Sequence, residues 1–262
     1  MTGKHLLWTL VLQLMVSLGL ACVSDVGADT TFHVPFDGTP LAASAGGSPA
    51  PRVYGEAEYS DGVKGEAVVL GGKRRLLYPA AGNVSARTGT IAFWACPQNW
   101  TPVVERFAFF VTLLRQEEGR LSRFMLYKVH NTTSLVLLAE NGVAGDRQLI
   151  ACPAASWAVG EWRHILLTWD GKRICVYFNG QLAGTSPGIT FPDAGWGQLV
   201  VGTSYPSWAF VGEEATAFDE LVVMAQPLSA EDAREMFRES LSGNRELAMV
   251  FEERDRAREN RK

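Results

Sequence analysis

Motifs that identify several large enzyme classes are missing from this sequence of 262 residues. No H-E-x-x-H, Walker-type or C-x-x-C pattern occurs, which argues against a zinc protease, a P-loop nucleotidase and a dithiol oxidoreductase. Histidine and cysteine are both scarce, with four residues each. The net charge is −4 and no basic block stands out before the C-terminus, so nucleic acid is not expected as a partner.

The longest apolar run, Leu6 to Ala21, is short for a membrane span and is not followed by a positively charged stop. It begins after a lysine, so we favour a secretory signal peptide over residues 1–28. An alternative is a bacterial lipoprotein signal over residues 1–21, with Cys22 as the lipidated residue, and a retained anchor is a third interpretation. Export would make the protein secreted, periplasmic or cell-surface, with membrane contact only through a lipid anchor.

Removal of such a leader leaves three cysteines, namely Cys96, Cys152 and Cys175. An odd number allows at most one intrachain disulfide and leaves one thiol free or buried. Export permits a disulfide, but the sequence does not identify the pair. The alternative, that all three are small buried apolar residues, is equally consistent with the sequence.

The most informative stretch, Gly160 to Thr185, predicts three consecutive antiparallel strands. Two segments rich in aromatic and aliphatic residues, Trp162 to Trp169 and Arg173 to Phe178, each run into a turn dipeptide. These dipeptides, Asp170-Gly171 and Asn179-Gly180, tolerate positive φ and favour tight hairpins. The first segment is apolar on both faces, which is typical of a strand covered on both sides in a sandwich.

This stretch also resembles the laminin-G-like domains of the concanavalin A-like lectin/glucanase superfamily, which carry a G-E-W-H-H pattern before the central strand. Arg163 replaces the first histidine, while His164 keeps the second. We expect His164 to be a core or sheet-face histidine with a hydrogen-bond partner, in preference to a catalytic or metal-binding residue. Three further segments match in the family's order: Phe32 to Gly38, Gly89 to Trp94, and Phe218 to Ser229. The resemblance implies an all-β, two-sheet antiparallel jelly-roll sandwich with its first and last strands as neighbours. It implies no particular activity, because this fold supports unrelated functions.

The domain organisation follows from the same comparison. With 47% hydrophobic residues the chain can form one large core, and no second domain is evident. We expect residues 29–228 to form the sandwich and residues 229–262 to form a C-terminal helix and charged tail. Ser229 and Asp232 resemble a capping box at the start of that helix. The tail beyond Gly243 is either a solvated helix or a partner-binding helix, and the sequence leaves both open.

Carboxylates in a catalytic arrangement are missing. Laminarinase-type relatives carry E-x-D-x-x-E or E-x-D-x-E, which places the acid and the nucleophile on one face of a strand. Here the acidic pairs, Glu213-Glu214 and Asp219-Glu220, are adjacent residues that face opposite ways on a strand. We therefore expect no catalytic residue and no enzyme. Some relatives bind calcium, but no loop here is dense in oxygen ligands, so a Ca2+ site stays open and unassigned.

The eight tryptophans are a high count and fall into groups with different surroundings. One group lies in strand patterns and is expected in the core: Trp94, Trp162 and Trp169. Trp196, Tyr205 and Trp208 instead lie in a segment rich in glycine, proline and serine. Aromatic rings on a rigid loop suit stacking against a sugar, so these three are the candidate ligand-binding residues. The alternative is that they cover the rim of the sandwich.

Three functions are consistent with the sequence. The first is a secreted or surface-tethered, non-catalytic module that binds carbohydrate or another extracellular ligand. The second is an interaction or adhesion module that docks a protein partner through a sandwich face or the C-terminal helix. The third is a glycan-active enzyme whose site is not recognised in the sequence.

Overall fold

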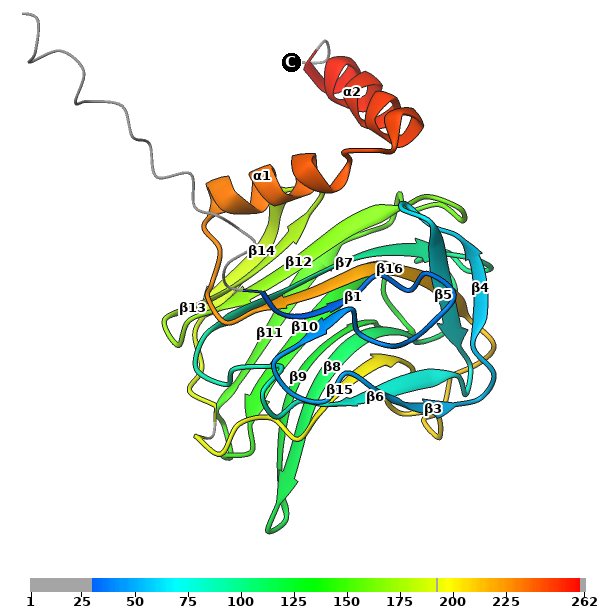
Figure 1. Cartoon of the computed structure of the whole chain (residues 1–262). Coiled ribbons are helices and arrows are strands. Elements are labelled where there is room, and N and C mark those ends of the chain that lie inside the picture. The colour runs from blue at the N-terminus through cyan, green and yellow to red at the C-terminus, as the bar shows by residue number, and fades with distance from the viewer. Residues whose placement is uncertain (1–29, 192, 260–262) are drawn as a thin grey trace, which may run out of the picture.

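The computed structural model describes residues 30–191 and 193–259, which form a sandwich of two antiparallel β-sheets (Figure 1). The predicted all-β jelly-roll sandwich with a C-terminal helical tail is therefore confirmed. The proposed leader and Cys22 lie outside the described residues. Within residues 30–191 and 193–259, no helix has the length and apolarity needed to cross a membrane.

The nine-stranded sheet carries the predicted meander at one edge. Its main path is β14 (Gln181–Pro187), β13 (Arg173–Phe178), β12 (Arg163–Trp169), β7 (Gly89–Pro97), β16 (Ala215–Met224), β1 (Thr30–Val34) and β2 (Ser44–Ala45). Off this path, β5 (Glu66–Gly71) pairs with β16, and β4 (Glu58–Asp61) pairs with β5. As predicted, the first and last strands are neighbours, with His33 opposite Val222.

The seven-stranded sheet forms the other layer. Its order is β11 (Arg147–Pro153), β10 (Ser134–Asn141), β9 (Arg120–Lys128), β8 (Ala108–Glu117), β15 (Gln198–Gly202), β6 (Arg75–Pro79) and β3 (Arg52–Tyr54). Strands β8 and β9 form a long antiparallel hairpin, in which Glu117 lies opposite Arg120.

Three of the four residues in the turn dipeptides of the meander have the positive φ that the sequence predicts, and Asp170 does not. Asn179 and Gly180 have φ values of 50° and 71°, and Gly171 has a φ of 73°. The Asp170 carboxylate caps its turn by accepting the N–H groups of Lys172 and Arg173 at 2.9 and 2.7 Å. Three consecutive antiparallel strands are therefore specified locally, before any long-range packing.

β16 has two different neighbours along one edge, because its pairing is interrupted at Asp219 and Glu220. Residues 215–218 pair with β5 and residues 221–224 pair with β1, while β7 lies along the other edge. Glu220 has a φ of 49°, which is uncommon for a residue other than glycine. The buried Asp219 carboxylate accepts the N–H groups of Lys64 at 2.9 Å and Glu220 at 2.8 Å. Burial raises the pKa of Asp219 to about 7, although these N–H groups act to lower it.

The core lies between the two sheets and is rich in aromatic rings. Phe93 points into it from β7 and contacts Phe110 of β8 and Phe218 of β16, with ring centroids 6.5 and 6.1 Å apart. Trp169 is buried in the same cluster, as predicted. Trp94 is also buried but faces the other side of β7, because successive side chains on a strand alternate.

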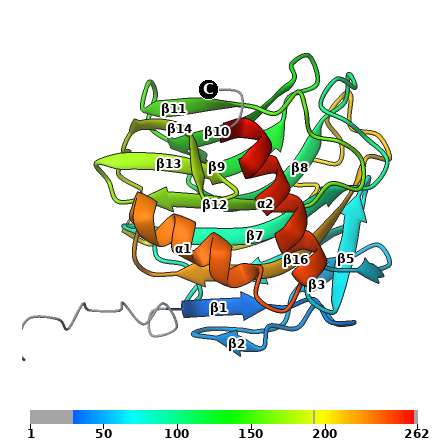
Figure 2. The ribbon, with the colours of Figure 1, turned by 90° about the horizontal axis from the view of Figure 1, so that it is seen from above.

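Two helices, α1 (Ala230–Ser240) and α2 (Arg245–Glu259), lie over the outer face of the nine-stranded sheet (Figure 2). The capping box is confirmed, with reciprocal bonds between Ser229 and Asp232 at the start of α1. Asn244 precedes α2 and donates to the Val63 carbonyl at 2.9 Å. The predicted charged tail is therefore largely helical and docked on the sandwich.

The cysteines at positions 96, 152 and 175 are buried, and none of these three forms a disulfide. The interpretation as small buried residues is the one that the structure supports. Burial raises the pKa of the Cys96 thiol to about 11 and that of Cys152 to about 12. These thiols are therefore protonated at neutral pH and poor nucleophiles.

His164 is buried beneath α1, where its ring packs against Trp94 and Phe237 at centroid distances of 5.2 and 5.9 Å. The expected core position is correct, but the expected hydrogen-bond partner is missing at Nδ1, which is buried without one. Burial lowers the pKa of His164 to about 3, so the ring is neutral at physiological pH.

His164 should make folding sensitive to acid. Its folded pKa lies below the unfolded value, so the unfolded chain binds the extra proton and stability falls as pH drops below about 6.5. We expect the stability of the native protein relative to His164→Phe to fall by roughly 2–3 kcal/mol between pH 7 and pH 4.5. Urea unfolding of both proteins across this range measures the difference. A constant difference would show that His164 titrates normally in the folded protein.

Candidate ligand-binding site

The loop of residues 203–211, between β15 and β16, lies on the outer face of the seven-stranded sheet. Thr112 of β8 faces outward from the sheet, and its hydroxyl shares a 2.5 Å hydrogen bond with the hydroxyl of Ser204. At the other end of the loop, the Phe107 N–H donates to the Phe210 carbonyl at 2.9 Å. The loop is therefore fixed to β8 and to the segment before it at both ends.

Four aromatic side chains from two loops meet on this face, and we call them the aromatic ridge: Tyr205, Trp208, Phe210 and His130. Tyr205 stacks on Trp208 with ring centroids 4.4 Å apart and planes at 11°. Phe210 stacks on His130, also at 4.4 Å, with planes at 6°. Phe107 joins the two pairs, at centroid distances of 5.5 Å from Trp208 and 4.8 Å from His130. The rings thus form one connected aromatic surface.

Phe210 is the most unusual residue of the aromatic ridge. It is 49% exposed and has a φ of 66°, in the left-handed region that bulky side chains rarely adopt. Such a conformation costs roughly 1–2 kcal/mol and persists only where the surrounding structure imposes it. The chain therefore accepts strain at a position whose ring remains half in solvent, a combination that favours a role in binding over a role in packing.

The structure brings together two of the three predicted binding residues. Tyr205 and Trp208 are both half-buried, and their stacking covers one face of each ring. The Arg123 guanidinium also lies over the Tyr205 ring, 5.8 Å from its centre. Trp196 is 3% exposed, and its centroid lies 4.6 Å from that of Phe191 in the core between the sheets. Its ring offers no face to a ligand, so Trp196 is a core residue and we remove it from the site.

Sequence reasoning missed His130 and Phe210. They lie 80 positions apart, and neither occurs in a pattern typical of a binding loop. The positive φ of Phe210 depends on the fold of the loop and has no signature in the sequence. Proximity in the folded chain is thus the observation that identifies both residues.

A buried lysine supports the base of the aromatic ridge. Lys128 is fully buried in β9, and its Nζ donates to the carbonyl of Val104 and, at 3.0 Å, to that of Arg106. Burial lowers the pKa of Lys128, and Glu214 and Glu105 partly oppose this effect. The lysine therefore positions the segment that leads to Phe107, the ring that joins the two stacked pairs.

A polar groove of about 420 Å³ adjoins the His130 end of the aromatic ridge. Its lining supplies hydroxyl, amide, carboxylate and imidazole groups, from Glu105, His130, Asn131, Thr132, Thr133 and Ser134. A surface of exposed rings beside a groove of this composition is complementary to a sugar, which presents both apolar and polar groups.

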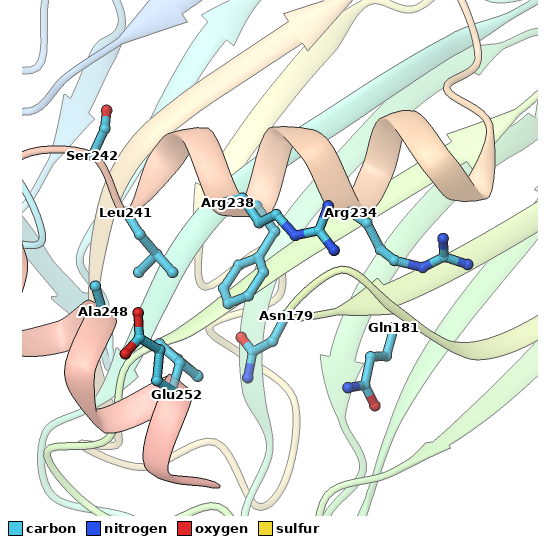
Figure 3. A pocket seen from close by; sticks show the side chains of 10 residues that line it. Asn179, Gln181, Arg234, Arg238, Leu241, Ser242, Ala248 and Glu252 are labelled. Carbon is cyan, nitrogen blue, oxygen red and sulfur yellow. The ribbon is translucent and has the colours of Figure 1, made fainter. Parts of the chain in front are cut away.

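A second hollow, of about 570 Å³, lies between α1, α2 and the β13–β14 turn (Figure 3). Arg234 and Arg238, one helical turn apart on α1, extend over it above Asn179 and Gln181 (Figure 3). Within the described residues neither arginine forms an ion pair. The hollow is thus lined by two arginines, by one carboxylate from Glu252 and by an apolar helix face.

Three of the four carboxylates in the acidic pairs noted in the sequence serve structural roles. Asp219 holds the interruption of β16, while Glu220 pairs with His33 at 3.1 Å and Lys64 at 3.9 Å. Glu214 accepts the Gly212 N–H at 2.9 Å. Among residues 30–191 and 193–259, no group of three histidine, cysteine or acidic side chains could hold a metal ion. No ligands are therefore assigned to a Ca2+ site.

One hydrolase-like pattern does occur by letter, G-x-S-x-G at residues 184–188. It lies in β14, at the edge of the nine-stranded sheet, and not at the strand-to-helix turn that exposes a catalytic serine. The Ser186 hydroxyl donates to the Pro187 carbonyl at 3.0 Å. The pattern is therefore a coincidence of sequence.

Comparison with known proteins now places the chain in a family. A family model described as the concanavalin A-like lectin/glucanases superfamily matches residues 70–234, more than half of the sequence. The chain belongs to this superfamily. No curated protein matches it in sequence. Since the superfamily name covers lectins and glucanases alike, membership in it fixes the fold and leaves the activity to be argued from the site.

Several solved binding domains share the fold of this concanavalin A-like chain. The receptor binding domain of botulinum neurotoxin D has a TM-score of 0.64 and 12% identity, over 80% of this chain and 52% of that chain. The binding domain of Paraclostridial Mosquitocidal Protein 1 has a TM-score of 0.58 and 12% identity, over the same shares. This chain thus spans about half of each of those structures, and at such low identity the likeness concerns the fold alone.

Glycine substitution should separate the exposed ring from the strain beneath it. Phe210→Gly relieves a positive φ but loses one stacked ring, so we expect the free energy of unfolding to change by less than about 1 kcal/mol. Phe36 is a matched control, because its φ is 63° but its ring is 0% exposed. Phe36→Gly should cost about 3–5 kcal/mol. Chemical denaturation measures both changes, and equal losses would mean that Phe210 is a packing residue.

Proposed function

We propose that this concanavalin A-like protein is a non-catalytic module that binds carbohydrate at the aromatic ridge. The observation that carries the proposal is the exposed Phe210 ring, held in a strained conformation on a surface that also presents Tyr205 and Trp208. A buried ring would be explained by packing, and a flexible one would lose entropy on binding. A fixed and half-exposed ring is suited to stacking against a sugar.

The surroundings of the aromatic ridge support a sugar over a purely apolar ligand. Sugars present C–H groups on their faces and hydroxyl groups around their edges. The ridge offers rings for the faces, and the groove beside His130 offers hydroxyl, amide and carboxylate groups for the edges. The similar folds described as receptor binding and binding domains are consistent with a binding role.

Hydrolysis is not proposed, because a retaining or inverting glycosidase needs two carboxyl groups that flank one bond. In the described residues, three of the four carboxylates in the acidic pairs are committed to backbone N–H groups or to cationic side chains, namely those of Glu214, Asp219 and Glu220. The raised pKa of Asp219 is a property of many general acids, but this carboxyl is fully buried inside the sheet and cannot reach a substrate.

A second candidate function is the docking of a protein partner over α1 and α2. It is favoured by the hollow under Arg234 and Arg238, and by Met249 and Val250 of α2, which are 53% and 39% exposed. An acidic segment with apolar side chains would match this surface. Glutamine at both arginines should weaken such a partner and leave glycan binding unchanged.

Glycan binding is tested by a glycan array on the purified chain, followed by calorimetry on the best ligand. Loss of one stacking ring is worth about 1 kcal/mol, so Phe210→Gly and Trp208→Ala should each weaken binding about fivefold or more. Leu182→Ala is the matched control, since this side chain is 56% exposed on β14 in the other sheet. No signal on the array, or equal effects of all three substitutions, would contradict the proposal.

We also propose that the protein is exported, on the strength of its N-terminal sequence. Mass spectrometry of the protein from its native host should give a mature chain that begins at Asp29. A chain that begins at Cys22 and carries the mass of acyl groups would instead identify the lipoprotein alternative. A mature N-terminus at Met1 or Thr2 would exclude both forms of processing.

A further inference from the structure

Beside the aromatic ridge lies a second surface, which we call the basic pocket. Tyr54 of β3 lies opposite Arg75 of β6, and the Arg75 guanidinium is 4.1 Å from the centre of the tyrosine ring. Arg52, two residues before Tyr54 on the same strand, places its guanidinium 4.8 Å from the same ring. Lys73 lies in the turn before Arg75. Two guanidinium groups thus contact one aromatic ring, and Lys73 lines the same pocket.

None of these three cations is held in an ion pair in the described part of the chain. Among the described residues, Arg52, Lys73 and Arg75 form no ion pair, whereas the adjacent Arg74 pairs with Glu58. The pocket lining contains no acidic side chain and comprises Tyr54, Gly55, Lys73, Arg75, Pro206 and Ser207. In a protein of net charge −4, such a local excess of positive charge is a feature of this surface and not of the whole molecule.

The basic pocket and the aromatic ridge share one loop. Pro206 and Ser207 line the pocket, and they lie between Tyr205 and Trp208 in the sequence. The two rings of that loop pack toward β8 and β9, on Phe109, while the pocket opens toward β3 and β6. A ligand that crosses the loop would therefore touch rings on one side and cations on the other. The basic pocket has a volume of about 610 Å³, which is large enough for one sugar unit.

We propose that the ligand is an acidic glycan, with a carboxylate or sulfate group seated in the basic pocket beside Arg75 and Lys73. This inference rests on the proposed carbohydrate function and specifies its substrate class. Arginine binds anionic oxygens with a planar pair of donors, and lysine adds a mobile donor at the rim. The Ser207 hydroxyl adds a neutral donor from the loop. Tyr54 holds the guanidinium groups in place through cation–π contact.

Matched polysaccharides separate the contribution of charge from that of the sugar. Dextran and dextran sulfate differ only in sulfation, and methyl-esterified pectin and polygalacturonate differ in free carboxylates. Calorimetry on the purified chain should show at least one anionic member binding about tenfold tighter than its neutral partner, and this preference should shrink as salt is raised. The pair with the larger difference in affinity between its anionic and neutral members identifies the bound group as sulfate or carboxylate.

Variants test whether this preference resides in the basic pocket. Lys73→Gln, an exposed change, and Arg75→Gln should each remove most of the preference for the anionic member and leave affinity for the neutral member unchanged. Arg87→Gln is the charge-matched control, because Arg87 is exposed and pairs with Asp193 away from the pocket lining. An intact preference in Lys73→Gln and Arg75→Gln, or an equal loss in Arg87→Gln, would overturn the inference.

Failure of this inference is distinguishable from failure of the proposed function. If neutral and anionic members bind equally and the binding depends on Phe210 and Trp208, the protein binds carbohydrate but the basic pocket has no role. If no polysaccharide binds at any salt concentration, both proposals are wrong.

Discussion

The sandwich depends on how β16 is divided between two partners. One strand pairs with β5 through its first half and with β1 through its second, and this is achieved by an interruption at Asp219 and Glu220. At that point the buried Asp219 carboxylate accepts the N–H of Glu220 in β16 and the N–H of Lys64 in the turn between β4 and β5. The positive φ of Glu220 provides the change of direction. This carboxylate therefore stabilises the point along β16 where the partner strand changes from β5 to β1.

Closure of the sandwich determines which surfaces remain for function. The outer face of the nine-stranded sheet is covered by α1 and α2, which are docked through contacts such as Arg254 with Glu161 at 2.9 Å. The outer face of the seven-stranded sheet is instead crossed by the loop of residues 203–211. That loop brings an aromatic surface and a cationic surface next to each other. A rigid two-sheet scaffold thus presents its proposed ligand site on a loop that is packed against strands at both ends.

The sequence predicts features that depend on neighbouring residues better than it predicts those created by long-range contacts. The meander follows from two turn dipeptides, and the start of α1 follows from Ser229 and Asp232. Tyr205 and Trp208 could be placed on a loop by composition alone, but the same composition wrongly suggested an accessible Trp196. The stacking of Phe210 on His130 depends on two loops that meet only in the folded chain. Lys73, Arg74 and Arg75 are consecutive in the sequence, but a count of formal charges does not show which of these cations lack an ion-pair partner.

Hydrogen exchange with and without a bound polysaccharide tests the central claim most directly, because it locates the ligand without any substitution. If the ligand lies on the aromatic ridge and the basic pocket, amide protection should increase in residues 203–211, at residues 130–134 and in the turn at residues 72–75. The amides of α1, α2 and the β13–β14 turn should exchange at unchanged rates. Protection confined to α1, α2 and that turn, with none in residues 203–211, would contradict the claim and place the binding surface on the helical side of the sandwich.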